Sequence, residues 1–266
     1  MRVMTWNLWW RFGDWERRAG AIAAVVAAEQ PDVLCLQEVW GEGGTSSAAL
    51  LAADLGWSCA VTDDPFAGRR DGRAAFHDAI VSRHPIVAVD SVALPGADGA
   101  PGHRRTLVAV VDTPAGPWPV VCTHLDHRFD ASAVRQAQCD ALLRIVAGAR
   151  RGEADPPPVL AGDLNAVPDS DEIRMLTGRR AAAVPGIVLS DCWEQAGEGP
   201  GWTWRRENPY LPDTAWPNRR LDYVLVAWPR PKPLGNPVRA WLAGVQPVDG
   251  VQPSDHAAVV VDLVGW

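Results

Sequence analysis

Short apolar runs alternate with polar, glycine- or proline-rich turns along the chain, and this pattern predicts the secondary structure. Runs rich in Val, Ile and Leu that last only a few residues are typical of strands. They predict strands over residues 2–8, 32–37, 79–82, 86–92, 106–112, 118–123, 159–162, 221–227 and 257–264. Apolar residues at helical spacing predict helices over residues 14–29, 46–55 and 131–150.

The balance of these elements indicates an α/β fold. Strands outnumber helices, and the helices lie early and midway in the chain. Two packed sheets with helices outside fit this order better than a doubly wound parallel sheet. No internal repeat or long linker divides the sequence, so we expect residues 1–266 to form a single domain. Segments 94–103 and 196–219, rich in Gly, Pro and Trp, are expected to be surface loops.

Composition narrows the possible partners and surroundings. The 266 residues are 47% hydrophobic, enough for one large core, and the formal net charge of -7 weighs against nucleic acid as the main partner. No apolar stretch approaches the ~20 residues of a membrane span, and the N-terminus lacks a secretory pattern. We expect a cytoplasmic protein and a monomer. The five scattered cysteines form no CxxC pair, which predicts buried free thiols rather than a zinc site.

Polar side chains recur at the ends of the predicted strands. Acids, amides and imidazoles follow or precede the apolar runs, where a rigid sheet would hold them at an exposed rim. These residues are Asn7, Glu38, His124, Asp163, Asn165, Asp222, Asp255 and His256. Each alone could be a turn residue, a surface acid or a core histidine, but their recurrence predicts a shared site.

The side-chain types suggest metal-assisted phosphoryl chemistry. Carboxylate and amide oxygens are hard ligands that suit Mg²⁺ or Mn²⁺ rather than zinc. Asp163 is a candidate to orient or deprotonate an attacking water. His256 titrates near neutral pH and could bind the phosphate or move a proton, and Asp222 is a candidate to fix its tautomer.

The motifs that carry these residues, in this order, resemble the endonuclease/exonuclease/phosphatase superfamily. That superfamily includes pancreatic deoxyribonuclease, abasic-site endonucleases, neutral sphingomyelinases, inositol polyphosphate 5-phosphatases and deadenylases. The resemblance spans almost the whole chain and implies a four-layer α/β/β/α sandwich with two mixed sheets. The matching motifs are TWN (5–7), QE (37–38), SRHPI (82–86), THL (123–125), GDLN (162–165), RLDYVLV (220–226) and SDH (254–256).

The resemblance also implies roles at the metal and the water. It implies that Glu38 and Asn7 bind the metal, Glu38 most directly, and that Asp255 is a possible second ligand. By the same match, Asp163 activates the water, and Asn165 orients it with the phosphate.

Histidine roles follow from the same match. His256 resembles the histidine at the scissile phosphate, paired with Asp222. His124 resembles the histidine near the phosphate and leaving group in the deoxyribonuclease and sphingomyelinase branches.

Two positions add candidates for substrate binding. Many superfamily members have Gly-Asn where this chain has His77 and Asp78, so Asp78 could hold His124 or alter the phosphate contacts. Arg83, in the SRHPI motif, could contact phosphate or form a structural salt bridge.

Tryptophans near residues 202–216 suggest an aromatic wall. Because this segment shortly precedes Asp222, Trp202 and Trp204 are expected to overhang the cleft, although core packing is the simpler interpretation.

Three functions remain open. The first is a phosphoesterase acting on a small or lipid-linked phosphorylated substrate, and the second is a nuclease acting on DNA or RNA. The third, a catalytically inactive binding module, is weakest because every expected chemical group is present. Arginine clusters at residues 69–73, 104–105, 205–206 and 219–220 could serve a nuclease, or could balance local acids.

Overall fold

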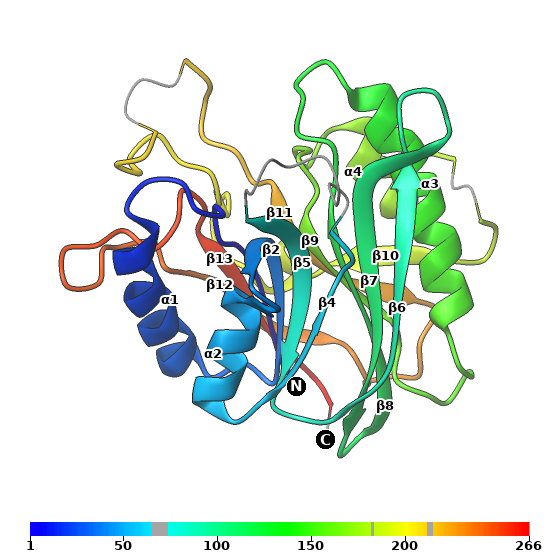
Figure 1. Ribbon diagram of the computed structural model, residues 1–266. Helices are drawn as coiled ribbons and strands as arrows, with labels where there is room; N and C mark the ends of the chain where they lie inside the picture. Colours follow the sequence, from blue (N-terminus) through cyan, green and yellow to red (C-terminus); the bar gives the residue numbers. More distant parts are fainter. Residues whose placement is uncertain (65–73, 182–183, 212–214, 266) are drawn as a thin grey trace.

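The structure, a computed structural model, describes the whole chain except residues 65–73, 182–183, 212–214 and 266, so the arginines at 69–73 lie outside the described residues. Two mixed sheets pack face to face (Figure 1). The first contains, in spatial order, β12 (Pro237–Ala243), β13 (Ala258–Leu263), β1 (Arg2–Asn7), β2 (Val33–Glu42), β5 (Ala75–Ser82) and β4 (Ser58–Val61), with β3 (Thr45–Ser46) paired to β2. The second contains β10 (Val188–Asp191), β11 (Asp222–Trp228), β9 (Val159–Asp163), β8 (Gly116–His124), β7 (Pro101–Thr113) and β6 (Ile86–Pro95).

Helices cover the outer faces of both sheets. Helices α1 (Trp15–Glu29) and α2 (Ser47–Leu55) lie on the first sheet, and α3 (Ser132–Ala149) and α4 (Asp171–Leu176) lie on the second, while the short α5 (Cys192–Ala196) packs against β11 and β12. The predicted four-layer α/β/β/α sandwich is therefore confirmed.

Strand periodicity explains how the layers form. Successive side chains of β1 point to opposite faces. Val3 packs between the two sheets with residues such as Trp118, whereas Met4 and Trp6 pack under the helices with Val26. One strand thus contributes to two hydrophobic layers.

Several elements differ from the sequence prediction. The expected loop 94–103 is strand at both ends, because β6 runs to Pro95 and β7 begins at Pro101, and only residues 96–100 form the turn. Strands β3, β4, β10 and β12 and helices α4 and α5 were not predicted. All five cysteines are free, as predicted, although Cys59 is only partly buried. Among the described residues, no helix is both long and apolar enough to cross a membrane.

Strand direction brings the polar strand ends to one rim. Strands β1 and β2 are parallel, with Asn7 opposite Gln37, and β8 and β9 are parallel, with His124 opposite Asp163. Asp222 begins the antiparallel neighbour β11 and also lies opposite Asp163. Both sheets therefore present their polar ends on the same side of the molecule.

Candidate active site

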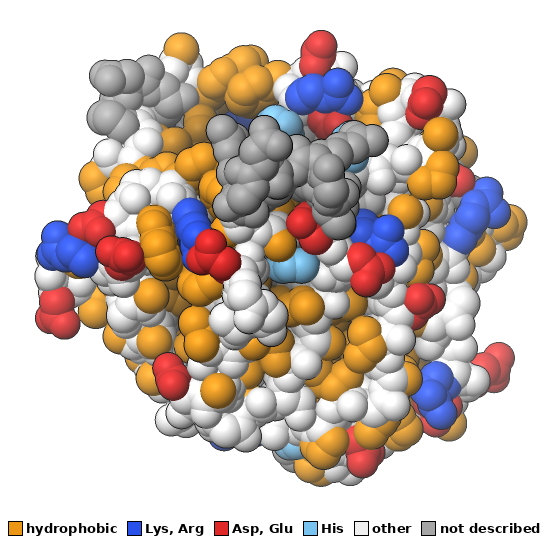
Figure 2. All heavy atoms as spheres, viewed as in Figure 1, with side chains coloured by type: hydrophobic (Ala, Val, Ile, Leu, Met, Phe, Trp, Pro, Cys, Tyr) orange, Lys and Arg blue, Asp and Glu red, His pale blue; other side chains and the backbone are white. Residues whose placement is uncertain are grey.

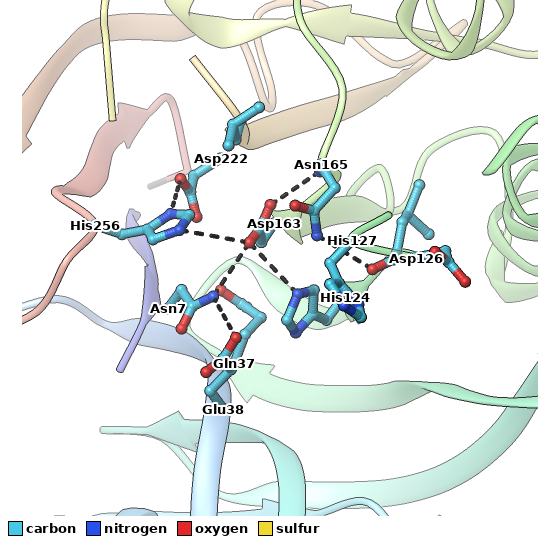
Figure 3. A network of polar contacts seen from close by, with 12 residues as sticks. Asn7, Gln37, Glu38, His124, Asp126, His127, Asp163, Asn165, Asp222 and His256 are labelled. Carbon is cyan, nitrogen blue, oxygen red and sulfur yellow. Dashed lines mark hydrogen bonds and ion pairs between the residues drawn. The ribbon is translucent and has the colours of Figure 1, made fainter. Parts of the chain in front are cut away.

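Asp163 is the centre of the polar network at this rim (Figure 3). Its Oδ2 accepts a hydrogen bond from Asn7 Nδ2 at 3.1 Å and lies 3.5 Å from His124 Nε2 and 3.9 Å from His256 Nε2. Its Oδ1 accepts the backbone amide of Asn165 at 2.9 Å. Burial and the nearby Asp222 raise the pKa of Asp163 to about 6, so this carboxyl is suited to exchange protons near neutral pH.

Asn165 adopts an unusual backbone conformation. Its φ of 49° is left-handed, which Asn tolerates better than most residues. Its Nδ2 donates to the carbonyl of Leu125 at 3.2 Å, on the loop that follows His124. The side-chain oxygen of Asn165 is therefore the group with freedom to contact water or phosphate.

His256 and Asp222 form the pair predicted from the sequence. The Nδ1 of His256 lies 2.8 Å from Asp222 Oδ2, and both side chains are buried. Burial alone would lower the pKa of His256, but Asp222, Asp255 and Asp163 raise it well above its ordinary value. The three carboxylates therefore favour the charged form of the His256 imidazole at the rim.

Glu38 and Asn7 form the neighbouring oxygen-rich part of the site. The Nδ2 of Asn7 also donates to Glu38 Oε1 at 3.2 Å, so one amide bridges Glu38 and Asp163. Burial and the charge of Asp255 raise the pKa of Glu38 to about 7. Burial also raises the pKa of Asp255, which accepts a hydrogen bond from Ser254 Oγ at 3.3 Å. The positive charges of His256, Arg104 and Arg18 oppose these upward shifts but do not cancel them.

Asp78 lies beneath Glu38 and not against His124. Its carboxylate accepts the backbone amide of Glu38, which sits at a bulge of β2 with a φ of 54°. Its other oxygen, Oδ1, is buried without a hydrogen-bond partner. Burial raises the pKa of Asp78 to about 8. The geometry gives Asp78 a part in positioning Glu38, and its predicted substrate contact stays a prediction.

Arg104 takes the place beside His124 that the sequence analysis considered for Asp78. Its Nη1 lies 2.9 Å from His124 Nδ1, and its Nη2 lies 3.4 Å from His127 Nδ1. Burial and this guanidinium lower the pKa of His124 well below its ordinary value. From the sequence, Arg104 was only one of several clustered arginines that could serve a nuclease or balance local acids; it lies in β7.

A cleft of about 1350 Å³ opens beside these residues. Glu38 and Arg104 line it together with the aromatic side chains of Trp10, Phe12 and Phe76. The sequence analysis did not assign these aromatic residues to the site. Trp10 and Phe12 follow Asn7 closely along the chain, which was the available signal.

Three predicted substrate-binding residues are not brought into the cleft. Arg83 follows β5 at the end of the strands that lies away from the site. There its guanidinium lies 3.9 Å from Asp32 and donates to the carbonyl of Gln30. This is the structural salt bridge that the sequence left open. Trp202 lines a separate groove of about 540 Å³, and Trp204 pairs through its backbone with Arg219 and His256. Trp204 therefore stabilises the backbone at His256 and does not line the cleft.

Comparison with known proteins identifies the family. A model of the Endonuclease/Exonuclease/phosphatase family matches residues 4–256. The chain belongs to this family. The resemblance predicted from the motifs is confirmed, and members of the family are metal-dependent hydrolases that act on phosphoester bonds.

Individual relatives support the same fold. Protein angel of Drosophila melanogaster is 28% identical over 206 residues, which are 74% of this chain and 57% of that protein, so the match spans little more than half of the relative. D. rerio TDP2 complexed with single strand DNA product has a TM-score of 0.77 at 20% identity and covers 98% of this chain and 97% of its own. An endonuclease/exonuclease/phosphatase from Beutenbergia cavernae has a TM-score of 0.71 at 28% identity, over 99% of this chain and 71% of its own.

Proposed function

We propose that this protein hydrolyses phosphate mono- or diesters by attack of water, with the assistance of Mg²⁺ or Mn²⁺. The observation that carries the proposal is the convergence of Asn7, His124 and His256 on one oxygen of the buried Asp163. A carboxylate held in this way, with a pKa of about 6, is suited to orient a water and accept its proton. The backbone amide of Asn165 donates to the other oxygen of Asp163, and its side-chain oxygen would orient the same water.

The residues present fit a divalent cation. Glu38, Asn7 and Asp255 offer hard oxygens, and a bound cation would offset the burial that raises the pKa of the two acids. A bound Mg²⁺ would stabilise the charge that develops on the phosphoryl oxygens. Asp163, Asp222 and His256 also lie close enough to share an ion, with ligand atoms within 4.8 Å of one another. We favour Glu38, Asn7 and Asp255 as the ligands, because Asp222 and His256 are already hydrogen-bonded to each other.

For the substrate, we favour a compact phosphorylated molecule or a phospholipid head group. The cleft pairs the Arg104 guanidinium with the aromatic walls of Trp10, Phe12 and Phe76, which suits one phosphate joined to an apolar or ring-bearing group. On the face shown in Figure 2, acidic and basic side chains are interspersed, and the described residues form no continuous basic band for a long nucleic acid.

A second candidate substrate is the end of a single-stranded nucleic acid. Phe129 and Trp216, about half exposed, stack with centroids 4.4 Å apart, and the Arg219 guanidinium lies over both rings. Such a platform can stack on a nucleobase. Burial lowers the pKa of Arg219 while Asp163 raises it, which puts the platform within electrostatic reach of the site. The TDP2 complex with single-strand DNA product supports this candidate.

A metal-supplemented substrate screen tests the proposal. The substrates are bis-p-nitrophenyl phosphate, glycerophosphodiesters, inositol phosphates, nucleotides and single-stranded and duplex DNA. Excess chelator should abolish hydrolysis, and Mg²⁺ or Mn²⁺ should restore it. Glu38→Ala should raise the metal concentration needed for half-maximal rate, whereas Glu16→Ala, at an exposed site on α1, should not. Full activity in excess chelator would refute the metal mechanism.

A further inference from the structure

The guanidinium of Arg104 and the imidazole of His124 meet in one direct contact. Arg104 Nη1 lies 2.9 Å from His124 Nδ1, and His124 is 1% exposed. Arg104 is itself held from two other sides: its Nη2 lies 3.4 Å from His127 Nδ1, and its guanidinium lies 5.9 Å from the Phe76 ring. The contact is therefore a fixed part of the cleft wall.

Hydrogen-bond chemistry decides the tautomer of His124. A guanidinium has only N–H donors and cannot accept a hydrogen bond. The Nδ1 of His124 must therefore be the acceptor, which leaves the proton on Nε2. The Nε2 lies 3.5 Å from Asp163 Oδ2, a carboxylate oxygen that suits an N–H neighbour. Both neighbours of the imidazole thus require the same tautomer.

The second histidine beside Asp163 has the opposite arrangement. The Nδ1 of His256 lies 2.8 Å from a carboxylate oxygen of Asp222, which can only accept when ionised. His256 therefore carries a proton on Nδ1 and is able to gain or lose one at Nε2. His124, with a cation at its Nδ1, cannot take a second proton there without losing the Arg104 contact.

We propose that Arg104 is a positioning residue that fixes His124 as the neutral Nε2–H tautomer, so that His124 acts as a hydrogen-bond donor and not as a proton carrier. The donor would hold Asp163 or a phosphoryl oxygen of the substrate. This inference rests on the proposed hydrolysis for its role, but the tautomer itself is a property of the free protein.

Nitrogen NMR tests the tautomer without substrate or metal. Long-range ¹H–¹⁵N spectra of histidine-labelled protein separate protonated from unprotonated ring nitrogens, and comparison with His124→Gln assigns His124 among the six histidines. At neutral pH, His124 should show a protonated Nε2 and an unprotonated Nδ1. A protonated Nδ1, alone or with Nε2, would overturn the proposal even if the protein proves to be an active phosphoesterase.

Arginine variants test the cause of the tautomer. Arg104→Met should give His124 mixed tautomers and lower kcat about 10- to 100-fold, as for other residues that orient a histidine. Arg105→Met is the matched control, because Arg105 is the next residue of β7 and its Nε donates a hydrogen bond to Ser91 Oγ at 2.9 Å. Its His124 spectrum should match the wild type. An unchanged tautomer in folded Arg104→Met would contradict the assignment.

Amide substitutions test the donor role. Glutamine can place an N–H near the position of Nε2, whereas asparagine is too short. His124→Gln should stay within about tenfold of wild-type kcat, and His124→Asn should lose about 10²–10³-fold, the usual cost of one lost donor to a developing charge. Equal losses in both variants would show that a neutral donor is not enough. If the wild-type protein hydrolyses nothing in the screen, the proposed function fails, while the NMR result still decides the tautomer.

Discussion

Asp163 combines three properties that a water-activating carboxylate needs. It is 1% exposed, its Oδ2 faces an amide and two imidazoles, and burial with the nearby Asp222 raises its pKa to about 6. The sequence predicted this residue and its neighbours because they stand at the ends of apolar, strand-like runs. It did not predict the role of Arg104, since an arginine within a strand pattern gives no sign of which group it faces.

Asp163→Asn tests the water-activation role. The amide keeps the shape of the side chain but cannot accept a proton from water, so kcat should fall about 10²–10⁴-fold on any substrate found active. The Tm should stay close to that of the wild type or rise, because a buried charge is removed. Asp140→Asn, on the surface of α3, is the control and should keep full activity. Wild-type turnover by Asp163→Asn would show that another group activates the water.

Asp222→Asn should act through His256. In the wild type, burial opposes the charged imidazole, while Asp222 and the other acids raise its pKa well above its ordinary value. Removing the Asp222 charge lowers that pKa, so His256 loses its proton at lower pH. The alkaline limb of the kcat/KM profile should therefore move to lower pH, with a smaller loss at the optimum than in Asp163→Asn. A uniform loss at all pH values would argue against this link.

At the scale of elements, strand direction decides which motif residues reach the site. Strand β5 runs antiparallel to β2, so its C-terminal end, with Arg83, lies at the edge opposite Glu38. The SRHPI motif can be found in the sequence, but the direction in which β5 runs cannot be read from it. The unpredicted β10 and β12 are short or half-exposed edge strands, whose polar residues hide the alternating pattern.

Arg18 of helix α1 connects two loops of the candidate site. The side chain is 1% exposed and donates to the carbonyls of Leu8, Trp9, Trp10, Phe12 and Pro253. The first four belong to the loop after Asn7, and the last precedes Ser254 and His256. One guanidinium therefore fixes the backbone on both sides of the rim.

Arg18→Met should destabilise the protein and misplace both loops. It leaves several buried carbonyls unsatisfied, so the free energy of unfolding should fall by about 3 kcal/mol or more. Arg17→Met is the control, because Arg17 is its exposed neighbour and makes one 3.5 Å ion pair with Asp14. Its effect should be within about 0.5 kcal/mol. Equal urea midpoints for the two variants would contradict the role of Arg18.

For the whole molecule, the balance of charge bears on the choice of substrate. The chain has 25 basic and 32 acidic residues, and the face in Figure 2 shows both signs interspersed. A compact ester needs only one phosphate to be bound at the rim, whereas a long duplex needs many cations along its path. The sequence predicted this contrast from composition alone, but it could not predict the cleft, which depends on how the β6–β7 hairpin stands beside Glu38.

Compact esters should therefore be better substrates than duplex DNA, and the difference should grow with salt. Each phosphate contact contributes a slope of about -0.9 in log–log salt dependence, so a single-phosphate substrate should lose only about three- to fourfold in kcat/KM between about 50 and 200 mM salt. Duplex DNA bound through about six phosphates would lose about 10³-fold over the same range. A short single-stranded oligonucleotide tests the second candidate substrate. Trp216→Leu should raise the KM for this oligonucleotide and leave the KM for glycerophosphodiesters unchanged. Efficient cleavage of plasmid DNA at about 150 mM salt, without activity on small esters, would contradict the preference for compact substrates and favour a nuclease.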